Sequence, residues 1–305
     1  MKMNSRLLGV IPEKDISLVA GFSDYLINGP KEHSNDTVRT YQQHFFTFLR
    51  HLPRKQGIIE SVSRANLNAV LVKIPHGMAS TRNNLVWSVK SFARYLESME
   101  LISKETLDGV LSIKLSRKHK PKRNYLKNDL IEDIIVSILK SQNYNEMERL
   151  TNISIFSTLS FTGLRSSELC NLRIEDIDFE NGKIVVISGK GGKTRVIGLP
   201  NKIVPLLKLY LRNRPESKYS NFFLGSKGSP LNRDLVGKRF SRISKTTEIS
   251  VSPHTLRRSF ATDVVQNRGV SLDKLQIVLG HSDIITTRNY VQTRTDDVAL
   301  EMRGW

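Results

Sequence analysis

Apolar side chains recur at helical spacing through residues 16–99, and prolines interrupt the pattern. The spacing predicts helices that begin near Ile16, Asp36, Ser63 and Ser80, with Asp36 as a cap. The positions expected to face inward are Ile16, Val19, Phe22, Leu26, Val38, Tyr41, Phe45, Phe48, Leu49, Leu52, Leu67, Val70, Leu71, Leu85, Val89, Phe92, Leu96 and Met99. Because this stretch has no strand pattern, residues 15–105 predict a small bundle of four helices.

From residue 124 onward the helical period returns and is broken once by strand character. Residues 183–187 and 194–199 are β-branched and apolar, and the glycine-rich turn 188–193 joins them. Helices are expected at 128–139 (Leu130, Ile131, Ile134, Ile135 and Leu139 inward), 146–162, from Ser166, from Pro200, at 233–245, 253–267 and 272–279. The chain is therefore predicted to be mainly α, and its second half to be mostly helical with a small antiparallel sheet.

A basic stretch over residues 114–123 separates the two halves and contains a proline. It cannot bury its charges and is expected not to fold alone. It is either a solvated linker alone or a linker that also lies along a phosphate backbone, where each lysine or arginine releases condensed counterions. The predicted organisation is a flexible arm (1–14), a helical bundle (15–105), a basic linker (106–123) and a second domain (124–305).

The charge balance narrows the possible partners. The 47 lysines and arginines exceed the 29 aspartates and glutamates, so the net charge is +18 and the pI about 10.0. A generally basic surface would explain this excess, but local clustering favours a polyanion such as double-stranded DNA. No apolar run is long enough to span a bilayer, and residues 1–6 lack the apolar core of a secretory signal, so a cytoplasmic, nucleoid-associated protein is expected. The single cysteine, Cys170, is expected to be a small core residue.

Basic side chains on the polar faces of the bundle and in the linker are candidates for DNA contact. A solvated helix face looks much the same, so each residue alone is weak evidence. The candidates are Arg39, Arg82, Lys90, Arg94, Arg117, Lys118, Lys120, Lys122 and Arg123.

Residues with potential catalytic chemistry lie in the second half. Arg165 follows Thr162-Gly163-Leu164, where one helix stops and the next begins, and Glu168 is spaced to orient it. Lys190 lies in the glycine-rich turn, from which it could reach a phosphate or protonate a leaving oxygen. The turn joins strand to strand and lacks the spacing of a nucleotide-binding P-loop.

The remaining candidates are His254, Arg257, His281 and Tyr290. His254 and Arg257 share one face at a helix start, a position that favours anions. Taken singly, each is more typical of a surface or packed residue. Together with Arg165 and Lys190 they provide what an in-line attack on a phosphodiester requires. The arginines neutralise the charge on the non-bridging oxygens, a lysine or histidine protonates the leaving oxygen, and the tyrosine is the nucleophile. No metal or other cofactor is expected.

The order Arg165, Lys190, His254-Thr-Leu-Arg257, Leu279-Gly-His281 and Tyr290 resembles the tyrosine recombinases, that is, the phage integrases and Xer-type site-specific recombinases. The resemblance implies a SAM-like core-binding bundle and a catalytic domain that clamp DNA from opposite faces. It also implies a 3′-phosphotyrosyl intermediate formed by Tyr290, with Arg165 and Arg257 holding the phosphate, His254 and His281 assisting, and Lys190 as general acid. The active form implied is a tetramer on two DNA sites that acts through a Holliday junction, with residues 296–305 docking on a neighbour and accessory DNA-bending proteins as possible partners.

Two positions depart from the pattern of Xer-type members. Tyr290 is followed by Val291-Gln292 rather than Thr-His, and Arg258 occupies a position that is often histidine. Two alternatives stay open: a DNA-relaxing enzyme similar to type IB topoisomerases, and a DNA-binding regulator of the same fold without catalysis. Relaxation of a plasmid that lacks any target site would favour the first, and a missing catalytic residue would have favoured the second.

Overall fold

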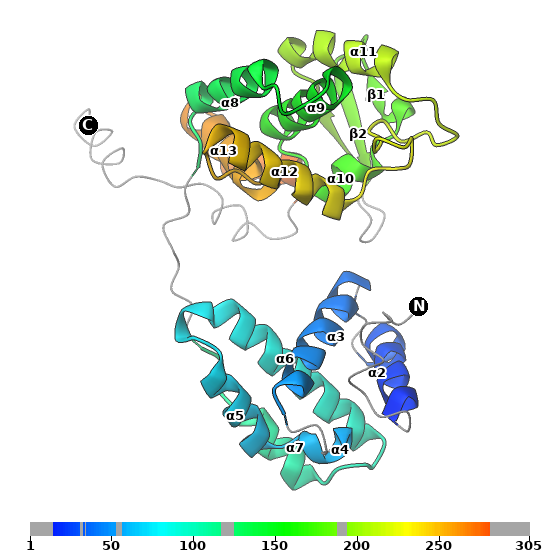
Figure 1. Cartoon of the computed structure of the whole chain (residues 1–305), viewed down its shortest axis with the longest axis vertical. Helices are drawn as coiled ribbons and strands as arrows, with labels where there is room; N and C mark the ends of the chain where they lie inside the picture. The colour runs from blue at the N-terminus through cyan, green and yellow to red at the C-terminus, as the bar shows by residue number, and fades with distance from the viewer. Residues whose placement is uncertain are drawn as a thin grey trace, which may run out of the picture. The chain divides into compact units, whose positions relative to one another are not determined.

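The computed structural model describes residues 15–30, 33, 35–52, 57–116, 125–187 and 194–280. The chain divides into two compact units, Met1–Lys122 and Arg123–Trp305. Both are mainly helical, as Figure 1 shows, and the strands belong to the second unit. The predicted fold class, mainly α with a small antiparallel sheet, is confirmed. Among the described residues, no helix is both long and apolar enough to cross a membrane.

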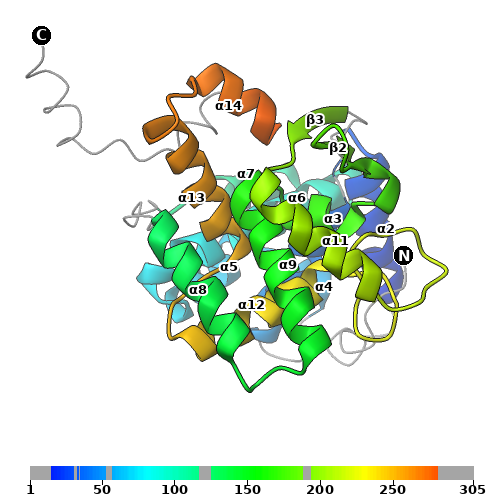
Figure 2. The same cartoon turned by 90° about the horizontal axis from the view of Figure 1, so that it is seen from above.

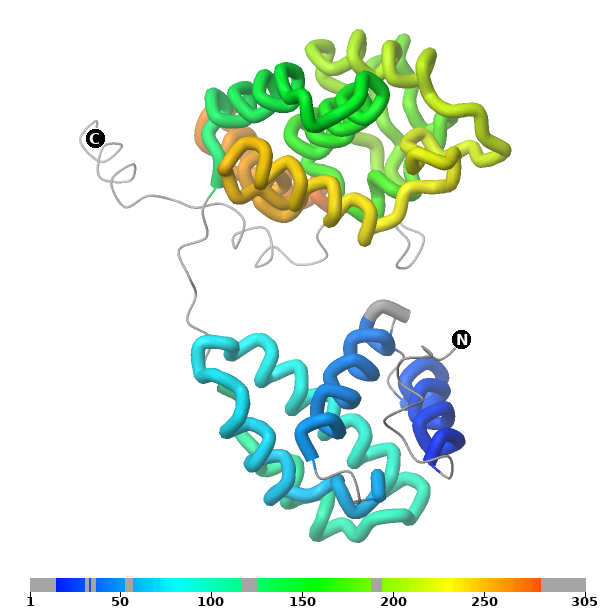
Figure 3. Tube along the Cα trace, viewed as in Figure 1, coloured from blue at the N-terminus to red at the C-terminus, as the bar shows by residue number. Residues whose placement is uncertain are grey.

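The first unit is built around one long helix, α6. Its elements are α2 (Ile16–Asn28), α3 (Asn35–Arg50), α4 (Ile58–Ser61), α5 (Arg64–Lys73), the 3-10 turn η2 (His76–Met78), α6 (Ala79–Ser98) and α7 (Lys104–Leu111). Helix α6 runs along the unit, as the trace in Figure 3 shows, and packs against α2, α3, α5 and α7. The four predicted helices are α2, α3, α5 and α6, and the short helices α4 and α7 were not predicted.

Aromatic rings fill the centre of this unit. The ring centroids of Phe45 and Phe92 are 4.1 Å apart, and those of Phe22 and Phe92 are 4.9 Å apart in an edge-to-face arrangement. All three side chains are buried, as their helical spacing predicts. Ser63 caps α5 by accepting a hydrogen bond from the backbone N–H of Asn66.

The second unit packs its helices around α9. Its elements are α8 (Asn128–Lys140), α9 (Glu146–Thr162), α10 (Ser166–Asn171), η3 (Ile174–Asp176), β1 (Ile177–Asp178), β2 (Lys183–Ile187), β3 (Thr194–Gly198), η4 (Asn201–Ile203), α11 (Val204–Asn213), α12 (Arg233–Thr247), α13 (Pro253–Gln266) and α14 (Leu272–Leu279). In Figure 2, α9 lies between α8 and α11, and it also contacts α13. The strands form an antiparallel sheet in the order β1-β2-β3, with Val185 paired with Val196.

Helix α9 is buried although many of its residues carry hydroxyl groups. Thr158 Oγ1 donates to the carbonyl of Ser154 at 2.7 Å, and Ser160 Oγ donates to the carbonyl of Phe156 at 2.8 Å. Thr162 Oγ1 makes the same bond to the carbonyl of Thr158 at 2.5 Å. Since these hydroxyls are satisfied within the helix, α9 can be enclosed by other helices without a large desolvation cost.

Several local predictions were wrong. Met99 and Leu139, expected to face inward, are 54% and 49% exposed, since each lies in the last turn of its helix or just beyond. Asp36 lies inside α3 rather than at its cap, because the helix begins one residue earlier. Pro200 is followed by the 3-10 turn η4, so that α11 begins later than expected. The strand β1 was missed because two residues show no alternation.

Candidate active site

Arg165 is positioned by the junction between α9 and α10. Gly163 ends α9 with φ +65°, and a Cβ there would meet the Phe260 ring, so glycine is required. Arg165 is the N-cap residue of α10, and Glu168 Oε2 accepts its backbone N–H at 2.8 Å. Its guanidinium Nη1 donates to Glu168 Oε1 at 2.9 Å. Glu168 therefore orients both the backbone and the side chain of Arg165, as the three-residue spacing predicts.

Arg257 links the ends of two other helices. Ser252 caps α13 by accepting from the N–H of Thr255 at 3.1 Å, which places Arg257 in the second turn of that helix. Its side chain is 2% exposed. Its Nη1 donates to the carbonyl of Gly163 at 2.5 Å, and its Nη2 donates to the carbonyl of Leu279 at 2.6 Å. Arg257 thus holds the end of α9 and the end of α14 together.

Arg195, on strand β3, is a third arginine of the cluster that the sequence did not single out. Its Nη1 and Nη2 donate to the two carboxylate oxygens of Glu168 at 2.8 and 2.9 Å, and its Nε donates to the carbonyl of Val278 at 2.8 Å. The side chain is only 11% exposed. Strand alternation could have indicated this placement, because Arg195 shares a face with Ile197, which is buried.

Glu168 is the anion at the centre of this cluster. Burial alone would raise its pKa, but hydrogen bonds from Arg195 and from the backbone of Arg165, with the charges of both arginines, lower the pKa to about 2. Arg257 Nη1 lies 3.9 Å from the same carboxylate. Three guanidinium groups surround one carboxylate, so the cluster carries a net charge of 3 − 1 = +2. Such a cluster can attract an anion.

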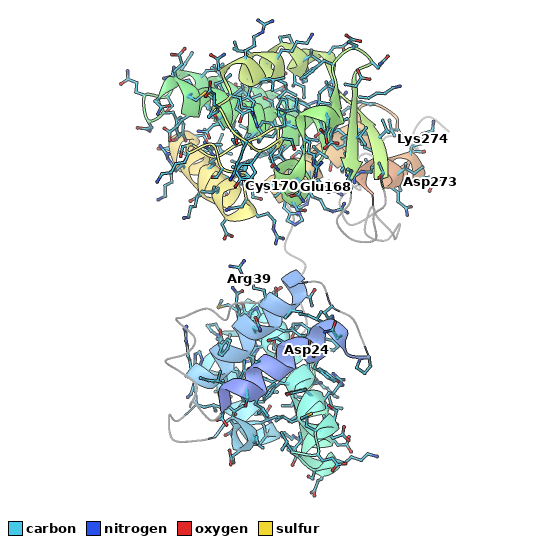
Figure 4. All side chains as sticks on the ribbon, turned by 90° about the vertical axis from the view of Figure 1, so that its right-hand side faces the viewer. Asp24, Arg39, Glu168, Cys170, Asp273 and Lys274 are labelled. Atoms are coloured by element: carbon cyan, nitrogen blue, oxygen red, sulfur yellow. The ribbon has the colours of Figure 1, made fainter. Side chains whose placement is uncertain are left out.

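The three arginines also hold the end of α14. Three consecutive carbonyls accept from them: Val278 from Arg195 at 2.8 Å, Leu279 from Arg257 at 2.6 Å, and Gly280 from Arg165 at 3.1 Å. The end of α14 and the site arginines therefore form one connected structure. In Figure 4, Glu168 lies on α10, whereas Asp273 and Lys274 extend outward from the beginning of α14.

The structure thus brings two of the six predicted catalytic residues, Arg165 and Arg257, to one place. His254 is exposed in the first turn of α13, one turn before Arg257. Lys190, His281 and Tyr290 lie outside the described residues. In the part of the chain that the structure describes, no group of three His, Cys, Asp or Glu side chains could hold a metal ion.

The DNA contacts predicted for the bundle stay predictions, but two of those residues already have structural roles. Arg82 donates to the carbonyls of Leu71 and Ile74, which lie at the end of α5, the second bond at 2.6 Å. Lys90 Nζ donates to two carbonyls at the end of α7 at 2.7 Å. Arg39 and Arg94 are exposed, and the Arg39 side chain extends away from α3 in Figure 4. The linker candidates Arg117, Lys118, Lys120, Lys122 and Arg123 lie outside the described residues.

Cys170 lies on α10, two residues after Glu168. It is buried, as expected, and burial raises the pKa of its thiol to about 11. A thiol with a raised pKa in a buried environment is little reactive at neutral pH, as expected of a core residue.

Comparison with known proteins gives consistent results along the chain. Residues 128–296 match the phage integrase family. A tyrosine recombinase of Thermosipho africanus is 32% identical over 88% of this chain and 93% of its own length. Tyrosine recombinase XerC of Lactobacillus delbrueckii subsp. bulgaricus is 29% identical over 94% of this chain and 98% of its own.

Solved structures agree with these sequence matches. The XerH site-specific recombinase bound to a palindromic difH substrate, in a post-cleavage complex, is 25% identical with a TM-score of 0.66, over 87% of this chain and 78% of that one. A λ integrase dimer bound to a COC′ core site has a TM-score of 0.69 at 20% identity, over 92% of this chain and 77% of that one. The second likeness shows the fold alone.

Proposed function

Because the chain belongs to the phage integrase family of tyrosine recombinases, which break and rejoin DNA, we propose that Tyr290 is the residue that becomes joined to DNA. The protein is a tyrosine-type site-specific recombinase. Its nucleophile must then lie near groups that can hold a phosphate. The observation that supports Tyr290 is the fixed start of its segment: Gly280, ten residues earlier, accepts a hydrogen bond from Arg165.

In the proposed reaction the Tyr290 oxygen attacks phosphorus and the bond to the 5′ oxygen breaks. This step leaves a 3′-phosphotyrosyl bond and a free 5′-hydroxyl. Lys190 donates the proton to the departing oxygen, and a histidine, His254 or His281, accepts the phenol proton. The phosphotyrosyl bond stores the energy of the broken phosphodiester, so that rejoining needs no nucleotide cofactor.

Arg165 and Arg257 are proposed to stabilise the charge that develops on the non-bridging phosphate oxygens. Support for this role comes from their convergence on Glu168 and the end of α14, in a cluster with net positive charge. Since the Arg257 side chain is 2% exposed, its charge is poorly screened by solvent and acts strongly on a nearby anion.

The wider organisation is part of the same proposal. Residues 15–105, together with α7 packed against α6, form a DNA-binding core domain. Residues 1–14 form an arm, the part of 106–123 that follows α7 forms a DNA-tracking linker, and 124–305 form the catalytic domain. Four protomers act on two double-stranded DNA sites through a Holliday junction, with residues 296–305 docking on a neighbour. Accessory DNA-bending proteins can assist, and the enzyme acts in the cytoplasm. The XerH recombinase bound to its difH substrate, named above, supports action on DNA.

The test uses a DNA substrate nicked next to the cleavage site. Cleavage releases a short fragment that carries the 5′-hydroxyl, and because this fragment diffuses away, the strand cannot be rejoined and the covalent complex accumulates. Tyr290→Phe is expected to abolish covalent attachment while DNA binding persists, because the nucleophilic oxygen is lost. Tyr219→Phe is the matched control, since Tyr219 is an exposed tyrosine in the same unit. Covalent attachment of the Tyr290→Phe protein would refute the proposal.

A further inference from the structure

Arg195 connects three elements around the site. It lies on β3 and donates hydrogen bonds to both carboxylate oxygens of Glu168 on α10 and to the carbonyl of Val278 at the end of α14. We propose that Arg195 is a positioning residue for DNA cleavage, which fixes the start of the Tyr290 segment relative to the phosphate-holding arginines. This inference rests on the proposed role of Tyr290.

The first argument is the geometry of the guanidinium group. Its planar fork matches the carboxylate of Glu168 in a bidentate pair, with bonds of 2.8 and 2.9 Å, while Nε points to Val278. A lysine ammonium lacks this fork and cannot make the same three bonds with one fixed orientation. Arg195 therefore sets the distance between α10 and α14 with little freedom.

The second argument is the close approach of Gly280. This residue has φ +63°, and a Cβ built on it would lie 2.9 Å from Arg195 Nη1 and 3.2 Å from its Cζ. The backbone at the end of α14 thus passes directly against the guanidinium, and a side chain at position 280 would displace that group. The chain leaves this contact as His281 and continues to Tyr290. If Arg195 moved, the starting point of the segment that leads to Tyr290 would therefore move with it.

The third argument is that two arginines share the carboxylate of Glu168 as a hydrogen-bond acceptor. Its Oε1 accepts from both Arg165 and Arg195, and its Oε2 accepts from the Arg165 backbone and from Arg195. If Arg195 were absent, Glu168 would be free to turn with Arg165. Arg195 therefore also fixes the orientation of Arg165, although it need not touch DNA itself.

A purely structural ion pair is the alternative, and Arg214 provides the matched control. Arg214 lies in the same unit and makes three hydrogen bonds, to the carbonyls of Tyr219 and Asn221, at 2.6, 2.9 and 3.2 Å. None of these three bonds reaches the cluster around Glu168. Arg195→Gln and Arg214→Gln remove the same number of arginine hydrogen bonds, but only the first removes a link to α14.

The experiment measures the single-turnover rate of covalent complex formation on the nicked substrate and, separately, DNA affinity. Arg195→Gln is expected to lower the cleavage rate about 100-fold, as a misplacement on the order of 1 Å can do, with little change in affinity. Arg195→Lys is expected to lie between it and the wild type. Arg214→Gln is expected to cleave at the wild-type rate. Circular dichroism and thermal melts verify that each variant is folded, and Arg195→Lys provides the test if the glutamine variant does not fold.

A second substrate separates positioning from proton transfer. A sulfur atom in place of the 5′ bridging oxygen leaves without protonation, so it is expected to rescue Lys190→Ala but not Arg195→Gln. Wild-type cleavage by folded Arg195 variants, rescue of Arg195→Gln by sulfur, or an equal loss in Arg214→Gln would overturn the inference. Tyr290→Phe distinguishes the two proposals: if it still attaches to DNA, the proposed function fails, whereas normal cleavage by Arg195→Gln alone removes only this inference.

Discussion

Replacing Glu168 with glutamine tests the electrostatic account of the site most directly. The change keeps the size of the side chain but removes the carboxylate that lies among the three guanidinium groups. Lowering the pKa of Glu168 from its ordinary 4.5 to about 2 corresponds to roughly 3 kcal/mol of stabilisation at neutral pH. The side chain is 6% exposed, so solvent screens this contribution little. We therefore expect Glu168→Gln to lower the free energy of unfolding of this unit by about 3 kcal/mol.

The same pKa fixes the pH dependence of that loss. Because the folded pKa lies below the unfolded value, the stabilisation is complete above pH 4.5 and disappears as the pH falls towards about 2. The difference between wild type and Glu168→Gln is therefore expected to be constant from neutral pH down to about 5, and to shrink below that. A destabilisation caused by altered packing would not depend on pH in this way.

Urea unfolding of the full chain provides the assay, and Cys170 provides a local probe. It is the single cysteine, it is buried, and it lies on α10, so its reaction with a thiol reagent at neutral pH reports unfolding of this unit. The pH series is followed by far-ultraviolet circular dichroism. Glu148→Gln is the matched control, since Glu148 pairs with Arg242 at the surface and is expected to contribute less than about 1 kcal/mol. An equal effect of the two substitutions at neutral pH would refute the reasoning.

Three further results are expected. Gly280→Ala should lower the free energy of unfolding more than Gly269→Ala, as compared by urea unfolding: both residues have φ near +65°, but only at Gly280 would a Cβ meet a guanidinium group. Arg82→Ala should destabilise the first unit by about 1–3 kcal/mol in thermal unfolding, because the Ile74 carbonyl at the end of α5 loses its Arg82 donor, whereas the exposed Arg94→Ala should change stability by less than about 0.5 kcal/mol. Cys170 should react with a thiol reagent at pH 8 far more slowly in the native protein than in urea, because its pKa is raised to about 11 and it is buried.

The sequence predicted the long helices well because their signals are local. Apolar spacing located α9 and α13, and Gly163 marked the end of α9 before the structure showed its positive φ. The three-residue spacing of Arg165 and Glu168 predicted their contact in the same way. Each of these features depends on residues within one turn of helix, which a pattern can register.

What the sequence did not predict depends on contacts between distant segments. Arg195 lies on a strand next to a basic glycine-rich turn, where a solvated charge is the ordinary expectation. Its partners Glu168 and Val278 are 27 and 83 positions away. In the same way, periodicity places Leu139 on the apolar face of its helix but cannot show that this residue, in the last turn of α8, stays exposed.

The cluster also explains how three guanidinium groups can share a small region without DNA. Their mutual repulsion is offset by Glu168 and by the carbonyls at the end of α14, where a helix carries partial negative charge. Arg165 and Arg257 are then in place before a phosphate arrives, so that less reorganisation is needed in the reaction. Removing the Glu168 charge would raise the net charge of the cluster from +2 to +3 and favour anion binding, while it loosens the groups that place the phosphate. Affinity and cleavage rate should therefore change in opposite directions, and only the rate reports the positioning role of this cluster.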